Sequence, residues 1–448
     1  MKNPILVLGA GRSAYSLLVY LNDLAEKENF RFTLAEAQSE ILLAKLKDLP
    51  NADGHTFSSS EVSDFIEIIL GHKIVISLLP PTMHPIVGKA CLECNANLIT
   101  ASYESPQMRE MAEDIEAKGL IFINECGLDP GIDHLSAMEI IDEIKEKGGI
   151  ISKFHSYCGG LVADEDDDNP FRYKISWNPK NVVLAGKGTA KFLQNNRHTL
   201  LPYNRVFSSA ETVFIKEWGK FEAYPNRDSV SYANIYGIPD VAYLKRGTLR
   251  KTGFCKRWNV FVQLGMTDDE TKIEFAPGAT YMDYMAVFLP EFLEGGSRAL
   301  ENFIGNVLIS NDIIELGFNP EKPDILKRNN GTPADFLLDL IVEKWSLKTN
   351  DKDLVVMVHQ FEYSLNGFGY QLIASFGLEG KNAINTAMAQ TVGLPLGICA
   401  KLLLHNQIGQ KGLVLPIIKD LYKPILKELS NFGVHFQKEL SVLNKSII

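Results

Sequence analysis

The first 125 residues alternate short apolar runs with segments in which apolar residues recur at helical spacing. Such alternation is typical of a parallel sheet that is covered by helices. The expected strands are Ile5–Leu8, Phe30–Leu34, a weaker run at His55–Phe57, Ile74–Leu79, Leu98–Thr100 and Leu120–Ile123. The expected helices are Ser13–Glu26, Ser39–Lys47, Glu61–Leu70, Pro85–Cys94 and Pro106–Lys118.

The pattern changes at about Asp129, where a long helical segment is followed by scattered strand-like runs rich in Thr, Tyr, Phe and Val. The turn Asn366-Gly367 predicts a hairpin, and helical spacing dominates around Val287–Leu347. The other expected elements are a helix at His134–Lys147, strands at Lys153–Cys158, Asp353–Tyr363 and Gly367–Phe376, a helical stretch from Asn382 to Gly409 interrupted at Gly393-Leu394-Pro395, a helix at Ile417–Leu429 and a short last run at Val434–Gln437.

A chain of 448 residues is too long for one hydrophobic core. We therefore expect an α/β chain with a Rossmann dinucleotide-binding domain at residues 1–128. An α+β substrate-binding domain follows at residues 129–394, with a small helical subdomain inserted at about 287–347.

Charge and cysteine content limit the classes of function. The chain carries 45 Lys and Arg against 55 Asp and Glu, a formal charge of −10, which disfavours nucleic acid and acidic membranes as partners. No segment approaches the length of a signal-peptide core or a membrane span, and the six cysteines are too sparse for a disulfide scaffold. These features predict a cytoplasmic protein.

Two clusters invite a metal-site interpretation, and we expect no metal at either. Cys91-x-x-Cys94 lies in a predicted helix without a second Cys or His pair nearby, so helix-packing thiols are expected rather than a zinc or redox site. The acidic run 164–168 is expected to be a solvated loop.

A glycine-rich turn predicts the cofactor site. Gly9, Gly11 and Ala14 form G-x-G-x-x-A directly between the first strand and its helix. Gly9 permits the tight turn, Gly11 lets the backbone approach a pyrophosphate, and Ala14 lets the helix lie close to the sheet. Arg12 and Ser13 then lie at the helix N-terminus, whose free N–H groups favour phosphate.

Glu36 ends the second expected strand, where an acidic residue accepts hydrogen bonds from the adenosine ribose and repels a 2′-phosphate. This predicts a preference for NAD over NADP. The alternatives are that Glu36 is a surface residue at the start of a helix, or that Arg12 binds a 2′-phosphate. Leu79, at the end of the fourth strand, completes the expected cofactor contacts in this part of the sheet.

Several segments along nearly the whole chain resemble the glutamate-forming saccharopine dehydrogenases. They are Ala101-Ser102-Tyr103-Glu104-Ser105-Pro106, the run from Asn124 to His134, Ser156 to Leu161, Asp168-Asn169-Pro170 with Tyr173 to Trp177, Tyr224-Pro225-Asn226-Arg227-Asp228, and Arg246-Gly247-Thr248-Leu249-Arg250. The resemblance implies a Rossmann domain completed by about residues 395–448. It also implies a substrate domain that mediates homodimer formation, and a small helical domain.

The same resemblance implies the roles of individual residues. Ser102 and Tyr103 would line both cofactor and substrate, and Asp129 would contact the substrate. Leu128, Asp129, Pro130 and Gly131 would line the nicotinamide side, while Arg227, Arg246, Gly247 and Thr248 would bind substrate carboxylates. The chain departs from the NADP-using fungal members at Ala35-Glu36-Ala37, where those place a basic residue, and this supports the NAD interpretation.

Chemistry alone supports part of this picture. Gly127–Gly131 follows the sixth strand, at the sheet edge where open α/β folds bind ligands. Oxidation of a secondary amine requires proton transfers, for which Tyr103, Asp129 and Cys158 are candidates, although Cys158 is alternatively a small packing residue. Asp133 is expected to cap a helix and His134 to be a satisfied first-turn residue.

Three functions compete at this stage. The first is oxidation of saccharopine to L-glutamate and 2-aminoadipate 6-semialdehyde with NAD or NADP, in lysine metabolism. The second is a carboxynorspermidine-type dehydrogenase that reduces an imine between an aldehyde and a diamine, whose substrate offers fewer carboxylates to Arg227 and Arg246. The third is a non-catalytic NAD-binding regulator.

Overall fold

A computed structural model describes residues 3–58 and 61–445. The chain divides into two compact units, Met1–Ile151 with Tyr363–Ile448, and Ser152–Glu362. The domain boundaries expected at 128 and about 394 remain a prediction, and the helix α7 (Ile132–Glu146) belongs to the first unit. There the Tyr422 hydroxyl donates to an Asp142 carboxylate oxygen at 2.7 Å. Residues 1–2 and 446–448 of the expected first domain lie outside the described residues.

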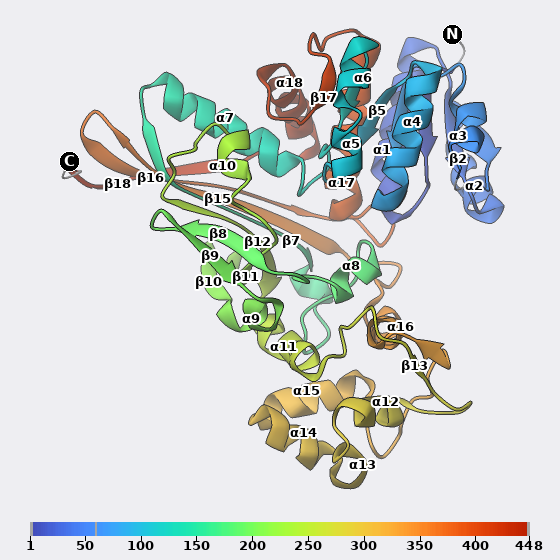
Figure 1. The fold of residues 1–448 in the computed structure, drawn as a ribbon, viewed down its shortest axis with the longest axis vertical. Helices are drawn as coiled ribbons and strands as arrows, with labels where there is room; N and C mark the ends of the chain where they lie inside the picture. The colour runs from blue at the N-terminus through green and yellow to red at the C-terminus, as the bar shows by residue number, and fades with distance from the viewer. Residues whose placement is uncertain (1–2, 59–60, 446–448) are drawn as a thin grey trace. The chain divides into compact units, whose positions relative to one another are not determined.

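A parallel sheet organises the first unit (Figure 1). Its strand order is β17-β6-β5-β4-β1-β2-β3, which confirms the predicted Rossmann-like architecture. The bounds are β1 Ile5–Leu8, β2 Phe32–Glu36, β3 Ala52–Thr56, β4 Ile74–Ser77, β5 Asn97–Thr100, β6 Ile121–Ile123 and β17 Gly412–Val414. β17 joins from the C-terminal part of the chain and pairs in parallel with β6, as the family resemblance implies.

The helices of this unit follow the expected periodicity with one break. The bounds are α1 Tyr15–Glu28, α2 Ser39–Leu46, α3 Val62–Ile69, α4 His84–Cys94, α5 Pro106–Arg109, α6 Ala112–Ala117, α17 Ala387–Leu404 and α18 Lys419–Leu429. The single helix expected at 106–118 is divided into α5 and α6, and Met108 and Met111 at the division are both buried. On α4, Cys91 and Cys94 are free thiols, and burial raises the pKa of each.

The interruption expected at residues 393–395 was wrong, because α17 runs through Pro395 without ending. A Cβ placed on Gly393 would lie 2.8 Å from the backbone nitrogen of Leu17, and one on Gly397 would lie 2.6 Å from the Tyr20 ring. The two glycines therefore let α17 pack closely on α1, and this burial outweighs the hydrogen bond that a helix loses at proline.

α17 also corrects the expectation that no segment approaches the length of a membrane span. It has 18 residues with a mean hydropathy of 1.5, which is long and apolar enough by composition. However, 72% of the helix is buried inside the protein, and a buried core helix of a globular unit passes the same test.

A mixed sheet organises the second unit, with the order β10-β11-β12-β7-β15. β12 pairs in parallel with β7 and antiparallel with β11. The bounds are β7 Ile150–Val162, β8 Ala190–Gln194, β9 Arg197–Leu201, β10 Glu211–Ile215, β11 Gly219–Pro225, β12 Tyr243–Lys251 and β15 Asp353–Leu365. This arrangement confirms the predicted α+β domain.

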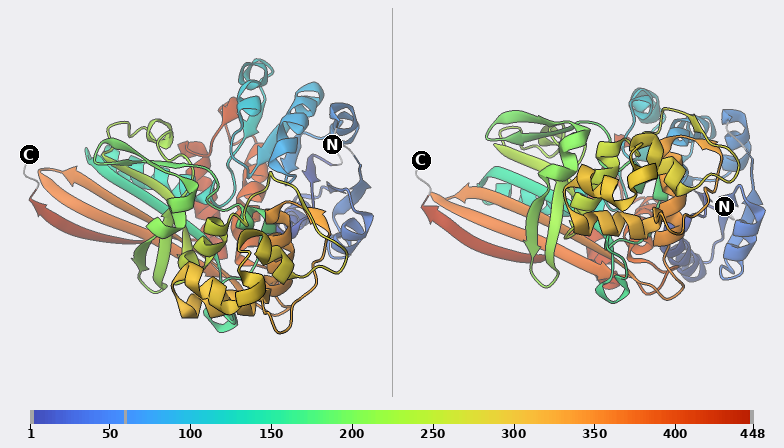
Figure 2. Two further views of the ribbon diagram at one scale, coloured as in Figure 1. Left: turned by 60° about the horizontal axis from the view of Figure 1, so that its bottom comes forward. Right: turned by 90° about the horizontal axis from the view of Figure 1, so that it is seen from below.

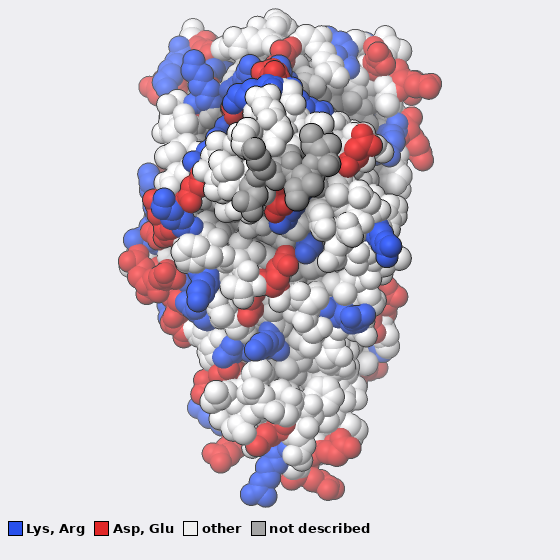
Figure 3. All heavy atoms as spheres, turned by 90° about the vertical axis from the view of Figure 1, so that its left-hand side faces the viewer, with Lys and Arg blue, Asp and Glu red and all other residues white. Residues whose placement is uncertain are grey.

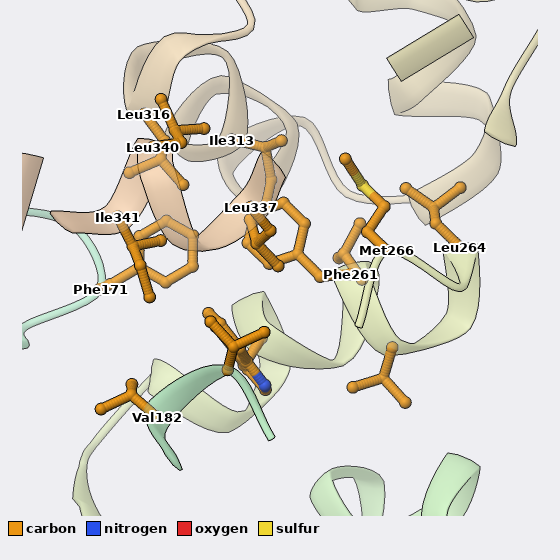
Figure 4. Close-up of a cluster of buried hydrophobic side chains, with 14 of the residues drawn as sticks. Phe171, Val182, Phe261, Leu264, Met266, Ile313, Leu316, Leu337, Leu340 and Ile341 are labelled. Carbon is orange, nitrogen blue, oxygen red and sulfur yellow. The ribbon is translucent and has the colours of Figure 1, made fainter. Parts of the chain in front are cut away.

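Helices α11 to α16 contribute many of the buried side chains of an apolar core cluster in the second unit, part of which Figure 4 shows as sticks. The rings of Phe171 and Phe261 stack with their centroids 5.9 Å apart, and Leu337 and Ile341 of α16 are fully buried in the same cluster. The bounds are α8 Pro179–Val183, α9 Tyr203–Val206, α10 Tyr232–Ile235, α11 Phe254–Leu264, α12 Tyr281–Phe288, α13 Phe292–Gly295, α14 Ser297–Ile304, α15 Val307–Gly317 and α16 Pro333–Trp345, with the short strands β13 Ile273–Glu274 and β14 Asn330–Gly331. The helical part expected from residue 287 thus begins at residue 281.

The hairpin at Asn366-Gly367 is confirmed, since both residues have the positive φ values, 53° and 77°, that a tight hairpin turn requires. It leads into β16 (Phe368–Glu379), which pairs antiparallel with β18 (Gln437–Lys445). Figure 2 shows these two strands in orange and dark red beside one another. The last strand lies beyond the short run expected at Val434–Gln437. Polar residues interrupt the apolar pattern of β18, and its pairing with β16 stabilises it.

The acidic run is not simply a solvated loop. Asp164 pairs with Lys251 at 2.5 Å and Asp168 with Lys174 at 2.9 Å, and both lysine side chains are almost fully buried. Asp167 lies 2.7 Å from Arg172, and its own side chain is only 7% exposed. The run therefore provides ion-pair partners for buried lysines of the second unit. On the face of the molecule shown in Figure 3, acidic and basic side chains are interspersed.

We expect Gly393→Ala to destabilise the first unit by about 1 to 3 kcal/mol, because the added methyl group must push α1 and α17 apart. Chemical denaturation followed by circular dichroism measures the change. Gly409→Ala is the matched control, since a Cβ at Gly409 would meet nothing within 4 Å. Equal stability of the two variants would contradict the close packing of α17 on α1.

Candidate functional site

The glycine-rich turn between β1 and α1 has the geometry of a phosphate-binding turn. Gly9 has φ +95°, a conformation that glycine adopts without strain, and its N–H donates to the Ala35 carbonyl at 2.8 Å. A Cβ on Gly11 would meet nothing within 4 Å, so its backbone faces open space. The 3-10 turn Arg12–Ala14 then leads into α1, with Ala14 fully buried. These residues fit a dinucleotide pyrophosphate.

Glu36 lies at the same turn. One oxygen of its carboxylate accepts the N–H of Ala10 at 2.7 Å and the other accepts the N–H of Gln38 at 3.2 Å. These bonds hold a negative charge directly beside the turn, so Glu36 is more than a surface residue at the start of α2. The Leu79 side chain also lies beside this turn, since a Cβ on Gly9 would be 3.5 Å from it.

The loops after β5 and β6 bring two of the candidate catalytic residues together. The Tyr103 hydroxyl donates to an Asp129 carboxylate oxygen at 3.2 Å, although the two residues are 26 positions apart. Both loops leave the carboxyl edge of the parallel sheet, the edge that also carries the glycine-rich turn after β1. The first unit therefore combines a cofactor turn with a hydrogen-bonded tyrosine and carboxylate pair.

The segment Gly127–Gly131 folds into a closed turn ahead of α7. The Asp129–Pro130 peptide is cis, and a Cβ on Gly131 would lie 2.0 Å from the Gly127 carbonyl oxygen. The prediction that Asp133 caps α7 was wrong, since the N-cap is Gly131 and the first helical N–H groups donate to carbonyls of the turn itself. Asp133 instead accepts the Gly131 N–H at 2.6 Å.

His84, which the sequence did not single out, holds Ser102 in place. Its Nδ1 lies 3.1 Å from the Ser77 hydroxyl, and its Nε2 lies 2.8 Å from the Ser102 hydroxyl and 3.0 Å from that of Thr100. Burial lowers the pKa of His84 to about 4, so the imidazole is neutral near pH 7. The ends of β4 and β5 are thus joined through one buried ring.

In the second unit, strand register places Cys158 beside the expected substrate residues. Cys158 of β7 is the register partner of Thr248 on β12, and Thr248 is in turn the partner of Tyr224 on β11. Because strand side chains alternate between faces, Arg246 and Arg250 share the face of Thr248.

Arg227 and Arg246 are held near one another by backbone bonds. The N–H of Asn226 donates to the Arg246 carbonyl at 3.0 Å, and Arg227 itself has φ +52°, a left-handed conformation that is uncommon outside glycine. The guanidinium of Arg246 stacks over the Tyr232 ring at 4.1 Å. Gly247 follows Arg246 on β12 and has no room for a side chain, because a Cβ there would lie 2.4 Å from the Tyr224 carbonyl oxygen of β11.

Arg250 was also missed, although it ends the quoted segment Arg246–Arg250. It is 2% exposed, donates to the Leu249 carbonyl at 3.0 Å, and lies over the rings of Tyr173, Tyr224 and Phe254. Its Nε has no hydrogen-bond partner among the described residues. Its place four residues after Arg246, and so on the same face of a strand, was the signal that could have indicated it.

Two family models match the chain in succession. Residues 5–123 match the saccharopine dehydrogenase NADP binding domain, and residues 127–434 match the saccharopine dehydrogenase C-terminal domain. The chain belongs to the saccharopine dehydrogenase family. The first match agrees with the cofactor turn described above and assigns this family member a domain of the NADP-binding kind.

Named relatives agree with the family. The chain is 34% identical to alpha-aminoadipic semialdehyde synthase of Rattus norvegicus over 98% of its own length, but it spans about half, 48%, of that longer protein. It is 31% identical to saccharopine dehydrogenase (NADP+, L-glutamate-forming) of Saccharomyces cerevisiae, covering 98% of this chain and 99% of that protein.

Solved structures show the same fold. The apo saccharopine dehydrogenase (L-Glu forming) of Saccharomyces cerevisiae superimposes with a TM-score of 0.87 at 30% identity, covering 98% of this family member and all of that chain. A homospermidine synthase of Legionella pneumophila, solved with NAD, has a TM-score of 0.58 at 12% identity over 98% of this chain and 92% of its own, which shows a shared fold alone.

We expect acid to destabilise this family member partly through His84. Its pKa falls from 6.5 when exposed to about 4 in the fold, so below pH 6.5 the unfolded state binds more protons and stability is lost as pH falls toward 4. The contribution is about 3 kcal/mol at most. Denaturant unfolding of His84→Gln at several pH values should show a correspondingly smaller loss.

The control for this measurement is His198→Gln, since His198 is exposed on β9. Its unfolding free energy should fall with pH as that of the wild type does. If His84→Gln and the wild type lose stability in parallel between pH 6.5 and 4, the buried imidazole is not the titrating group.

Proposed function

We propose that this protein is a glutamate-forming saccharopine dehydrogenase of lysine metabolism. It oxidises saccharopine with NAD+ or NADP+ and water to L-glutamate and L-2-aminoadipate 6-semialdehyde, releasing the reduced cofactor. The observation that carries the proposal is the Tyr103–Asp129 hydrogen bond on the sheet edge that bears the cofactor turn, in a chain of this family. The fungal relatives that the chain covers almost fully carry the same activity in their names.

The polyamine-forming and non-catalytic alternatives are not favoured. The likeness to homospermidine synthase is one of fold, at 12% identity, whereas relatives named for saccharopine oxidation reach 31% over nearly the whole chain. Saccharopine also has three carboxylates, for which a pair of arginines provides charge-assisted donors that a diamine substrate would not use.

The cofactor turn and the Tyr103–Asp129 pair divide the chemistry between them. The first unit would hold the nicotinamide cofactor through its glycine-rich turn, and the cofactor would supply a hydride acceptor for the carbon beside the secondary amine. Asp129, which accepts the Tyr103 hydroxyl, can take a proton from the amine or from attacking water, and the pair can return a proton to the departing amino group of glutamate. Ser102, fixed by His84, orients the ligands beside this pair.

The second unit binds the carboxylates in this proposal. Arg227 and Arg246 provide the guanidinium groups. Gly247 and Thr248 follow Arg246 on β12, and Cys158 on β7 adds a thiol as the register partner of Thr248. Planar guanidinium groups bind carboxylates through two parallel hydrogen bonds, which gives orientation as well as affinity.

A preference for NAD over NADP is a further part of the proposal. The family model and the fungal names refer to NADP. In this chain, however, the Glu36 carboxylate is held beside the turn by the Ala10 N–H. At that place it would accept hydrogen bonds from ribose hydroxyls and would repel a 2′-phosphate.

A cytoplasmic homodimer acting on small molecules completes the proposal. All six cysteines are free thiols, which suits a reducing compartment, and the net charge of −10 opposes binding to nucleic acid or to acidic membranes. The pair β16 and β18 carries exposed apolar side chains at Phe368, Leu440 and Val442, and such a surface is typical of a subunit contact.

The reaction is tested with purified protein, saccharopine and each oxidised cofactor. We expect the absorbance of the reduced nicotinamide, at about 340 nm, to increase with time. Mass spectrometry should identify glutamate and the semialdehyde as the products. The rate should rise with pH, because only the unprotonated amine gives up hydride. Formation of lysine and 2-oxoglutarate would show that the other carbon–nitrogen bond of saccharopine is cleaved, and would contradict the assignment. Condensation of a diamine with an aldehyde, without saccharopine oxidation, would favour the polyamine-forming function instead.

Cofactor choice is tested by steady-state kinetics with NAD and NADP. We expect the wild type to have a higher kcat/KM with NAD than with NADP. Glu36→Ala should lower the ratio of kcat/KM with NAD to kcat/KM with NADP by about tenfold or more, equivalent to roughly 1.4 kcal/mol. Glu40→Ala, which removes an exposed carboxylate in the first turn of α2, should leave the ratio unchanged. A wild-type preference for NADP would disprove the assignment.

A further inference from the structure

The loop that carries Tyr103 is held from both sides by one residue. The backbone N–H of Glu125 donates to the Ser102 carbonyl at 3.0 Å, and its side-chain Oε1 accepts the Glu104 N–H at 3.0 Å. These two bonds enclose Tyr103, whose hydroxyl donates to Asp129. A single residue at the end of β6 therefore connects the positions before and after a candidate catalytic side chain.

Glu125 adopts an unfavourable conformation to make these bonds. Its φ is +58°, in the left-handed region that costs a residue with a Cβ about 1 to 2 kcal/mol, and it is only 4% exposed. A buried carboxylate adds a desolvation cost unless it is fully hydrogen-bonded. Backbone strain of this kind persists where the surroundings hold it, and it occurs often at functional sites.

His134 supplies the second partner of the buried carboxylate. Its Nε2 lies 2.8 Å from Glu125 Oε2, and its Nδ1 lies 3.7 Å from an Asp133 carboxylate oxygen. His134 is completely buried in the first turn of α7. Asp133 in turn accepts the Gly131 N–H of the turn that contains Asp129. The contacts thus run from α7 to both members of the Tyr103–Asp129 pair.

We propose that Glu125 is a positioning residue that holds Tyr103 against Asp129, and that His134 orients the Glu125 carboxylate. Neither residue touches the substrate in this proposal. It rests on the proposed function, because the hydroxyl that Glu125 places is the one assigned to proton transfer there. A residue that only stabilises the fold would not affect kcat through one particular side chain, whereas Glu125 affects kcat only through Tyr103 in this proposal.

A double-mutant cycle with Tyr103→Phe tests this dependence. In the wild-type background we expect Glu125→Ala to lower kcat with saccharopine by about 10- to 100-fold, since a misplacement of roughly 1 Å can have that effect. In the Tyr103→Phe background the same change should lower kcat by less than about threefold, because the hydroxyl that it misplaces is already absent. The KM for the cofactor should stay near its wild-type value in both backgrounds.

Two further variants separate positioning from stability. Glu125→Gln keeps an oxygen that can accept the Glu104 N–H, so it should recover most of the kcat lost in Glu125→Ala. Glu428→Gln is the matched control, because Glu428 is a partly buried carboxylate of the same unit that accepts from Tyr20 at 2.6 Å and from Lys401 at 2.8 Å. Its kcat should equal that of the wild type at temperatures where both are folded.

Independent effects would overturn the proposal: if Glu125→Ala and Tyr103→Phe lower kcat by factors that multiply, Glu125 does not act through Tyr103. An unchanged kcat in folded Glu125→Ala would overturn it equally. Should Glu125→Ala not fold, Glu125→Asp, which is one methylene shorter, takes its place in the cycle with the same criteria. Absence of saccharopine oxidation by the wild type would instead count against the proposed function, so the two failures are distinguishable.

Discussion

Buried polar groups at the carboxyl edge of the parallel sheet are stabilised by partners within the protein, and this requirement arranges much of the candidate site of the first unit. Asn124, directly after β6, is an exception, since neither polar atom of its buried side chain has a hydrogen-bond partner among the described residues. A buried donor or acceptor left unpaired costs about 1 to 3 kcal/mol. His84 meets the requirement by joining Ser77 to Ser102, and Glu125 meets it by bonding the backbone on either side of Tyr103. Ser102 and Tyr103, which are proposed to contact the ligands, are therefore held in place by the buried side chains of His84 and Glu125.

Strand geometry has the equivalent effect in the second unit. Alternation along β12 directs Arg246, Thr248 and Arg250 to one face, and Gly247 leaves room for the neighbouring Tyr224 carbonyl. Buried guanidinium groups are costly to desolvate, and here aromatic rings partly offset that cost, through Tyr232 beneath Arg246 and three rings around Arg250. A sheet face with arginines prepared in this way suits a substrate rich in carboxylates.

The cofactor turn combines a general and a particular feature. Gly9 and Gly11 give the backbone the conformation and the open space that a pyrophosphate needs in any protein of this fold. Glu36 is particular to the edge of the turn, where its carboxylate is fixed by the Ala10 N–H. In the proposed function, phosphate binding and the preference between NAD and NADP therefore depend on different residues.

The sequence by itself determined the features that depend on neighbouring residues. Periodicity located the six N-terminal strands to within a few residues, and the spacing of Gly9, Gly11 and Ala14 located the cofactor turn. The hairpin at Asn366-Gly367 was equally visible, because a tight turn needs positive φ at two adjacent positions. The family resemblance added Tyr103, Asp129 and the arginines, although not the contacts between them.

Only the tertiary structure decided the features that depend on residues far apart in the chain. The path of α17 through Pro395 follows from its close packing on α1, and β17 and β18 are strands because distant strands pair with them. The contacts of His84 with Ser102 and of Glu125 with the Glu104 N–H could not be predicted locally, since these partners lie 18 and 21 positions away and meet them only when the sheet assembles. Sequence patterns report what each segment prefers, whereas burial and hydrogen bonding between segments decide which buried groups come to support the site.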